Sequence, residues 1–295
     1  MQNFEGRTAV VTGGASGIGF ALAERFAQAR MNVVLADIEK DALEHAVKAL
    51  EEKQVRVIGV VTNTMRRDTV QALAERVVTE FGKVHILCNN AGVVSRNEGA
   101  KGVWEIPDED WQWVMGVNFW GVLYGLQAFV PGMLAHGEEG HIVNTASLAG
   151  WLPGGGPYGV TKHGVLSLSE GLYADLQARK AKIGASVLCP GFVNTQIFDA
   201  ERNRPQDLVG NAATGAGVTP GLAEAGRALL AQGKQPSEVA NIVFESIAQG
   251  RFYILPHPAW DAIVRSRTEQ ALARGVPVSV DLADMTQRRA AGEQF

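Results

Sequence analysis

The stretch RTAVVTGGASGIG, residues 7–19, decides the fold. Its first six residues are typical of a short buried strand, and the helical stretch FALAERFA follows at residues 20–27. Glycines in the turn between them let the backbone approach a pyrophosphate, while the helix N-terminus offers free N–H groups. Any α/β protein can carry a Gly-rich turn, but this one has the strand and helix that dinucleotide binding requires. The predicted contacts in the turn are Gly13, Ser16, Gly17, Ile18 and Gly19.

A carboxylate follows at the place where a dinucleotide site needs one. Asp37 ends the next expected strand, about 20 residues after the glycines, where it can accept hydrogen bonds from ribose hydroxyls. A 2′-phosphate would be repelled there, Ile38 rather than an arginine follows, and Ser16 occupies the position in the turn where a basic residue could serve. The pattern therefore predicts NAD(H) rather than NADP(H). A helix N-cap for residues 40–53 is compatible with the same position of Asp37.

Acid–base chemistry is indicated by a tyrosine and a lysine four residues apart. Tyr158 and Lys162 share a helix face, and Ser147 lies eleven residues before the tyrosine. Free tyrosine titrates near ~10, so a base at pH ~7 requires about 4 kcal/mol of phenolate stabilisation. A nearby ammonium and an oxidised nicotinamide both favour the phenolate. A surface Tyr–Lys pair is the alternative, but the strand, the serine and the Gly-rich turn together predict hydride transfer between a nicotinamide and an alcohol or ketone.

The order and spacing of these motifs resemble the short-chain dehydrogenase/reductase family, in its single-domain branch, over about residues 4–256. The motifs are residues 12–19, Asn89-Asn90-Ala91-Gly92, Asn118, Ser147, Tyr158 with Lys162, and Pro190-Gly191 with Thr195. The resemblance implies that Tyr158 is the acid/base and that Lys162 lowers its pKa and binds the nicotinamide ribose. It also implies that Ser147 positions the substrate and that Asn118 holds a water connecting Lys162 to solvent.

The resemblance further implies where the cofactor lies. Asn90 would contact the adenosine ribose region, while Val193 and Thr195 would reach the carboxamide and the nearby phosphate. One position departs from the family, because the third strand ends in Thr62-Asn63-Thr64 where an Asp usually accepts from the adenine amine. Asn63 keeps an acceptor oxygen but loses the charge. The remaining expected cofactor contacts are Ile38, Thr64, Ala91, Gly92, Pro190 and Gly191.

Strand and helix patterns alternate along the chain. Strands are expected near residues 8–12, 32–37, 55–61, 85–89, 140–145, 184–189 and 252–255, and helices near 18–29, 39–53, 67–81, 108–136, 158–181 and 237–249. The alternation predicts one α/β domain with a doubly wound, Rossmann-like parallel sheet of about seven strands, covered by helices on both faces. Ligands of such sheets bind at the carboxyl ends of the strands. We expect residues 1–256 to form the catalytic domain and residues 257–295 a C-terminal extension of it.

Residues 196–235 are rich in Gly, Ala and Pro and are expected to form a lid with one or two short helices. A solvent-facing insertion is the alternative. Aromatic residues near the catalytic positions indicate an apolar or ring-containing substrate, with Ser147, Trp151, Tyr158 and Phe192 as its contacts. A substrate with a carboxylate or phosphate is the alternative, because Arg202 and Arg204 in this segment could bind the negative charge.

Composition narrows the class of protein. The 295-residue chain has a net charge of −4, no basic block and no apolar run of membrane-spanning length, so nucleic acid and membrane are not expected as partners. We expect no secretory signal, because the first residues lack a charged and an apolar region, and the two cysteines, Cys88 and Cys189, predict a cytoplasmic protein without a disulfide or a metal site. Apolar residues on more than one face of 108–136 indicate a homodimer or homotetramer. Another reaction on the same fold, or a non-catalytic dinucleotide sensor, are the alternative functions.

Overall fold

The computed structural model describes residues 1, 3–97, 102–152, 154, 156–209 and 222–277. Its centre is a seven-stranded sheet in the order β3-β2-β1-β4-β5-β6-β7, in which every neighbouring pair is parallel. The strands are β1 Thr8–Thr12, β2 Asn32–Asp37, β3 Val57–Val61, β4 Ile86–Asn89, β5 Gly140–Thr145, β6 Ile183–Leu188 and β7 Tyr253–Ile254. The predicted doubly wound α/β fold is confirmed.

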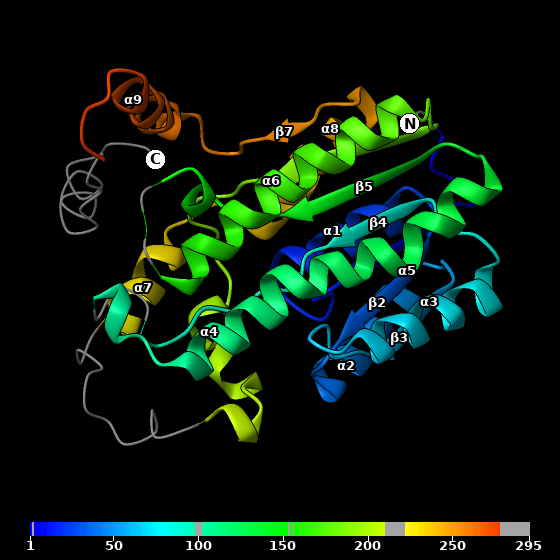
Figure 1. Ribbon diagram of the computed structural model, residues 1–295. Coiled ribbons are helices and arrows are strands. Elements are labelled where there is room, and N and C mark those ends of the chain that lie inside the picture. Colours follow the sequence, from blue (N-terminus) through cyan, green and yellow to red (C-terminus); the bar gives the residue numbers. More distant parts are fainter. Residues whose placement is uncertain (2, 98–101, 153, 155, 210–221, 278–295) are drawn as a thin grey trace.

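Helices cover both faces of the sheet (Figure 1). The covering follows from the alternation of side chains along each strand. Val11 and Leu35 pack with α1, α2 and α8, whereas Val10 and Val34 pack with α3, α5 and α6. Both faces are therefore apolar, as expected of a buried parallel sheet. The helices are α1 Gly17–Gln28, α2 Lys40–Glu51, α3 Arg67–Phe81, α4 Asp108–Met115, α5 Gly121–His136, α6 Pro157–Ala178 and α8 Pro236–Gln249.

The helix predicted at 108–136 is continuous but contains one irregular turn. Between α4 and α5 the segment η2, Gly116–Trp120, is a π-helix. Among the described residues, Asp108–His136 is the one helix long and apolar enough to cross a membrane, and 56% of its most apolar window is buried inside the protein. Packing of α5 against the sheet and α3 accounts for that apolar character.

The lid and the C-terminal extension are described in part. The lid begins with two 3-10 helices, η4 Ile197–Asn203 and η5 Gln206–Leu208, and ends with α7 Leu222–Ala231. Beyond β7 the chain forms a short turn, η7 Pro258–Trp260, and α9 Asp261–Leu272. Residues 210–221 of the expected lid and 278–295 of the expected extension lie outside the described residues.

Candidate active site

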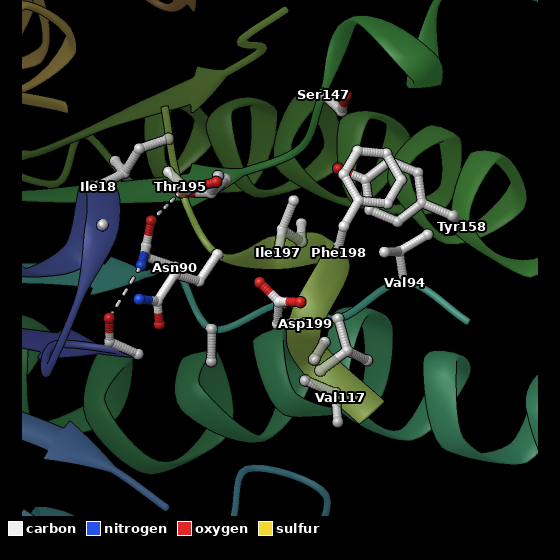
Figure 2. A pocket seen from close by; sticks show the side chains of 18 of the residues that line it. Ile18, Asn90, Val94, Val117, Ser147, Tyr158, Thr195, Ile197, Phe198 and Asp199 are labelled. Atoms are coloured by element: carbon white, nitrogen blue, oxygen red, sulfur yellow. Dashed lines mark hydrogen bonds between the residues drawn. The ribbon is translucent and has the colours of Figure 1, made fainter. Parts of the chain in front are cut away.

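A cavity of about 1540 Å³ opens at the carboxyl ends of the strands. Figure 2 shows Ile18, Asn90 and Thr195 toward one end of it and Ser147, Tyr158 and Phe198 toward the other. The predicted site residues that line it are Gly13, Ser16, Gly17, Ile18, Asp37, Ile38, Asn63, Thr64, Asn90, Ala91, Gly92, Ser147, Tyr158, Lys162, Pro190, Gly191, Phe192, Val193 and Thr195. Gly19, Asn118 and Trp151 are predicted site residues that do not line the cavity.

Glycines shape the turn between β1 and α1 for steric reasons. Gly13 and Gly17 have φ of +63° and +53°, in the left-handed region that favours glycine. A Cβ on Gly19 would lie 2.0 Å from the carbonyl oxygen of Gly13. Only a residue without a Cβ allows the backbone at position 19 to approach the Gly13 carbonyl this closely. Gly19 therefore shapes the turn although it does not line the cavity.

The N-terminus of α1 faces the cavity and is suited to an anion. Ser16 is the N-cap residue, and its side chain makes no capping hydrogen bond. Ser16, Gly17 and Ile18 all line the cavity. Because the first N–H groups of a helix have no intrahelical partner, they and the helix dipole can bind a pyrophosphate here. These features fit the phosphates of a dinucleotide.

Asp37 holds the turn from the end of β2. Its Oδ2 accepts from the Ala15 N–H at 2.9 Å, and its Oδ1 accepts from the Glu39 N–H at 3.1 Å. The helix α2 begins at Lys40 with Glu39 as its N-cap, so Asp37 does not cap it. Each carboxylate oxygen has a second lone pair that can accept a further hydrogen bond.

Asn63 lies beyond the end of β3 and also lines the cavity. Its Oδ1 accepts from the Met65 N–H at 3.0 Å, which fixes the direction of the amide. The oxygen is therefore shared with the backbone, and the NH₂ group is the part of the side chain that can donate to an adenine ring nitrogen.

Asn90 ties three strand ends together. Its Nδ2 donates to the Thr12 carbonyl oxygen at 3.1 Å, and its Oδ1 accepts from the Thr145 hydroxyl at 3.3 Å. These contacts join the ends of β1, β4 and β5 beneath the cavity floor. Gly92 follows, where a Cβ would lie 3.4 Å from Lys162 Nζ.

Lys162 is the buried charge of the site. Its side chain is 2% exposed, and its Nζ donates to the Thr145 carbonyl oxygen at 2.9 Å. Burial lowers the pKa of Lys162 to about 8. The Nζ lies 5.5 Å from the centre of the Tyr158 ring, so the i, i+4 spacing does bring the two side chains together.

Ser147 follows β5 and presents a hydroxyl at the same end of the cavity. The Ser147 Oγ donates to the Pro190 carbonyl oxygen at 3.4 Å and accepts from the Ala149 N–H at 3.1 Å. The first of these bonds is long, which leaves the hydroxyl proton available to a substrate oxygen.

Asn118 lies behind the catalytic residues, on the π-helical turn. It is fully buried, and its Oδ1 and Nδ2 bond the N–H and carbonyl of Val93 at 2.8 and 2.9 Å. Its Nδ2 also donates to the Thr161 hydroxyl at 3.3 Å. The side chain therefore fastens the loop after β4 to the helix. Both amide hydrogens of Asn118 are used in these bonds, so a water between Asn118 and Lys162, as the resemblance implies, would bond its Oδ1 or its main chain.

Trp151 does not face the cavity. Its Nε1 donates to Cys189 Sγ at 3.3 Å, and its ring packs edge-on against Tyr253 at 5.8 Å. Phe192, in contrast, lines the cavity and meets the ring of Trp260 at 5.8 Å. Trp260 was not predicted, because the contact joins segments far apart in the sequence. The apolar residues at this end of the cavity include Leu152, Phe192, Phe198, Leu229, Leu230 and Trp260.

Part of the segment 196–235 lies against the cavity. Residues from η4 and α7 line it, and ion pairs tie η4 to the body of the protein. Arg202 bonds Glu39 beside Asp37 at 2.6 Å, and Arg204 bonds buried Asp110 at 2.6 Å. The arginines that line the cavity each have an acidic partner, in the pairs Arg96–Glu201, Arg202–Glu39 and Arg227–Asp199.

Comparisons with known proteins agree with this geometry. The family model for short chain dehydrogenase matches residues 7–206, more than half of the chain. A crystal structure of a short chain dehydrogenase/reductase from Burkholderia phymatum in complex with NAD is 44% identical, with a TM-score of 0.88, and the match covers 95% of this chain and 99% of that one.

Two curated relatives are named for the alcohols they act on. The 1-deoxy-11-beta-hydroxypentalenate dehydrogenase of Streptomyces avermitilis is 36% identical over 84% of this chain and 83% of its own. The 3beta-hydroxysteroid dehydrogenase 2 of Eggerthella lenta is 34% identical over 72% of this chain and 82% of its own. With the matched motifs and the parallel sheet, these findings show that the chain belongs to the short-chain dehydrogenase/reductase family.

Proposed function

We propose that this protein is an NAD(H)-dependent oxidoreductase that interconverts a secondary alcohol and a ketone. The observation that carries the proposal is that one cavity is lined both by Asp37 and the Gly-rich turn and by Ser147, Tyr158 and Lys162. The NAD complex of the Burkholderia phymatum relative supports the choice of cofactor. The residues at the adenosine end fit NAD, since a carboxylate can accept from ribose hydroxyls.

Bound NAD⁺ would supply the hydride acceptor. In alcohol oxidation the Ser147 hydroxyl holds the substrate oxygen, and Tyr158 removes the hydroxyl proton as general base. The Lys162 ammonium favours the phenolate form of Tyr158 by charge, and the low dielectric of a buried site strengthens that effect. In ketone reduction the same tyrosine returns the proton.

The alternatives have less support. A non-catalytic dinucleotide sensor would not need Ser147, Tyr158 and Lys162 together on the cavity wall. An enoyl reductase has a longer Tyr–Lys gap than the four residues found here, and the larger epimerase type has a longer chain and a different glycine spacing.

The substrate proposed for this site is uncharged, bulky and apolar. The substrate end is lined by aromatic and aliphatic side chains, and the arginines on the described cavity wall are paired with carboxylates. A substrate carboxylate or phosphate would have to break one of these ion pairs to bind an arginine. The relative named for a hydroxysteroid supports a neutral, ring-containing alcohol. The relative named for a hydroxypentalenate, which is a carboxylate, supports the ring-containing alcohol but not the absence of charge.

The decisive experiment is a panel of secondary alcohols with NAD⁺, read by NADH absorbance. Neutral alicyclic and aryl alcohols are expected to be oxidised with kcat/KM at least tenfold above matched alcohols that carry a carboxylate. The physical reason is the desolvation of an unpaired charge in an apolar pocket. Preference for the carboxylate-bearing member of each matched pair would refute the neutral-substrate assignment, and no turnover with any alcohol or ketone would refute the reaction.

Cofactor choice gives a second test. The native protein is expected to prefer NAD⁺ over NADP⁺ in kcat/KM by several-fold or more, because Asp37 repels a 2′-phosphate. The double variant Asp37→Ser with Ile38→Arg should narrow or reverse that preference. Asp41→Ser, which removes a carboxylate from the first turn of α2, is the control and should leave the ratio unchanged. Equal kcat/KM for both cofactors in the native protein would contradict the role of Asp37.

We also propose that the protein forms a homo-oligomer and that it is located in the cytoplasm. Trp120 on the long helix and Val160 on α6 are each 43% exposed, and Trp120 stacks on Tyr124 at 6.1 Å. Exposed apolar side chains on these helices support pairing with a second copy, which light scattering measures. Cys88 and Cys189 are both free and buried, as fits a reducing compartment.

A further inference from the structure

A buried histidine from the C-terminal extension holds the loop that follows β6. His257 is 2% exposed and lies just beyond β7. Its Nδ1 accepts from the Gly191 N–H at 3.0 Å, and its Nε2 bonds the Phe192 carbonyl oxygen at 3.1 Å. Gly191 and Phe192 line the cavity, whereas His257 does not. The histidine therefore acts on the site through the residues that it holds and not by direct contact with a ligand.

We propose that His257 is a positioning residue that fixes the Gly191–Phe192 backbone against the nicotinamide half of the cofactor. The inference rests on the proposed function, because it takes the Pro190–Thr195 segment as the wall beside the nicotinamide. It assigns to the C-terminal extension a part in the site that no motif of the dinucleotide fold supplies.

The two contacts require one form of the ring. A nitrogen that accepts from an N–H carries no proton, so Nδ1 is bare and Nε2 carries the hydrogen that it donates to Phe192. A single rigid side chain thus satisfies a backbone donor and a backbone acceptor that are one residue apart. Without His257 the Gly191 N–H would lose this acceptor, while the Phe192 carbonyl would keep the Lys234 N–H that donates to it at 3.1 Å, so the loop would be held less firmly in this position.

The loop is held from the opposite side by the catalytic serine. The Pro190 carbonyl accepts from the Leu148 N–H at 2.9 Å and from Ser147 Oγ at 3.4 Å. A Cβ on Gly191 would lie 3.2 Å from His257 Cγ and 3.0 Å from a methyl of Leu148. The residue is therefore enclosed between the Ser147–Leu148 segment and the histidine ring. A shift of the loop away from His257 would disturb both the cofactor wall and the position of Ser147.

The same turn supplies part of the substrate wall. The backbone N–H of Trp260 donates to the His257 carbonyl oxygen at 3.1 Å, and the Trp260 ring packs against the Phe192 ring. His257 and Trp260 thus fix Phe192 through its backbone and its ring. Loss of His257 is consequently expected to affect the nicotinamide and substrate end, and to leave the adenosine end around Asp37 intact.

The test compares the binding of NAD⁺ with the binding of ADP-ribose, which contains the adenosine half of the cofactor and lacks the nicotinamide. In His257→Ala, KM for NAD⁺ should rise about tenfold and kcat should fall, as expected when the Gly191 N–H loses its acceptor and the Phe192 carbonyl keeps only the Lys234 donor on this side of the loop. The inhibition constant of ADP-ribose, which lacks the nicotinamide, should stay within about twofold of the native value. An equal rise in both constants, or no change in either, would overturn the proposal.

Conservative variants keep the test decisive if His257→Ala does not fold. His257→Asn keeps an acceptor for Gly191, and His257→Gln keeps a donor for Phe192, so each should recover part of the lost affinity for NAD⁺. His141→Asn is the matched control, since His141 is also 2% exposed and bonds Ser186 at 2.7 Å, but belongs to β5 and does not line the cavity. It should lower the melting temperature without changing KM for NAD⁺. Failure of both conservative variants to recover any affinity would overturn the proposal.

Calorimetric NAD⁺ binding distinguishes this inference from the proposed function. If the native protein binds NAD⁺ but turns over no alcohol or ketone, the proposed reaction fails while the binding comparison still measures the role of His257. If the native protein is active and the His257 variants bind NAD⁺ as tightly as it does, the inference fails alone.

Discussion

Replacing Tyr158 with phenylalanine is expected to abolish turnover while NAD⁺ still binds. Phenylalanine keeps the ring that packs beside Val93 and Trp113 but lacks the hydroxyl that carries the proton. A positioned acid–base group typically contributes about 10²–10⁴-fold to the rate. We therefore expect kcat to fall by at least that lower factor, with the dissociation constant for NAD⁺ nearly unchanged.

NADH absorbance measures the rate, and calorimetry measures NAD⁺ binding. The matched control is Tyr173→Phe, because Tyr173 lies on the same helix α6 but is 39% exposed and contacts Phe252 instead of the cavity. That variant should keep native activity. A Tyr158→Phe enzyme with more than a tenth of native activity would show that another group moves the proton.

The fold could be predicted because its signals are local. Each long strand is a run of apolar residues, and each is followed by a helical pattern and a turn, so the parallel order follows from the alternation. The sequence predicted the ends of the strands less accurately. The third strand was expected from residue 55 and begins at Val57, and the last was expected over four residues and comprises Tyr253–Ile254 alone. Strand ends depend on pairing with neighbours, which the sequence of one strand does not encode.

The site was predictable to the extent that topology determines it. Asp37 ends a strand, and Asn90, Ser147 and Pro190 each follow one, so a parallel sheet must bring them to one edge. The direction in which a side chain points does not follow from topology. Trp151 is near Ser147 in the sequence, yet its ring turns toward Cys189 because packing, and not spacing, decides its rotamer. Contacts such as those of His257 join residues more than 60 positions apart and leave no pattern in the sequence.

Lys162→Met is expected to make the protein more stable and less active. Folding buries Lys162 and lowers its pKa from 10.5 to about 8. Below pH 8 the folded protein therefore holds an ammonium that burial disfavours, which lowers the free energy of unfolding on the order of 3 kcal/mol. The hydrogen bond to Thr145 offsets about 1 kcal/mol of that. Methionine has a similar length without the charge, so the variant should gain about 2 kcal/mol, or a few degrees in Tm.

The pH dependence of this gain follows from the direction of the pKa shift. Between pH 8 and 10.5 the folded protein releases the Lys162 proton while the unfolded chain keeps it, so the penalty decreases as pH rises and is gone above 10.5. The difference in Tm between variant and native protein should therefore be largest near pH 7 and shrink toward pH 10. The control is Lys40→Met, because the Lys40 side chain is 72% exposed and its replacement should give no such pH-dependent gain.

Activity should change in the opposite direction. Without the ammonium beside it, Tyr158 loses a charge that favours its phenolate, so the apparent pKa for alcohol oxidation should rise by ~1 unit or more. NAD⁺ binding should also weaken if the same ammonium bonds the nicotinamide ribose. A rise in KM for NAD⁺ with an unchanged pH profile would mean that Lys162 binds the ribose and does not tune the tyrosine. A variant that is less active and also less stable at pH 7 would show that Lys162 supports the fold. The expected combination, higher Tm with a shifted pH profile, is what results when a buried charge is kept for catalysis against its effect on stability.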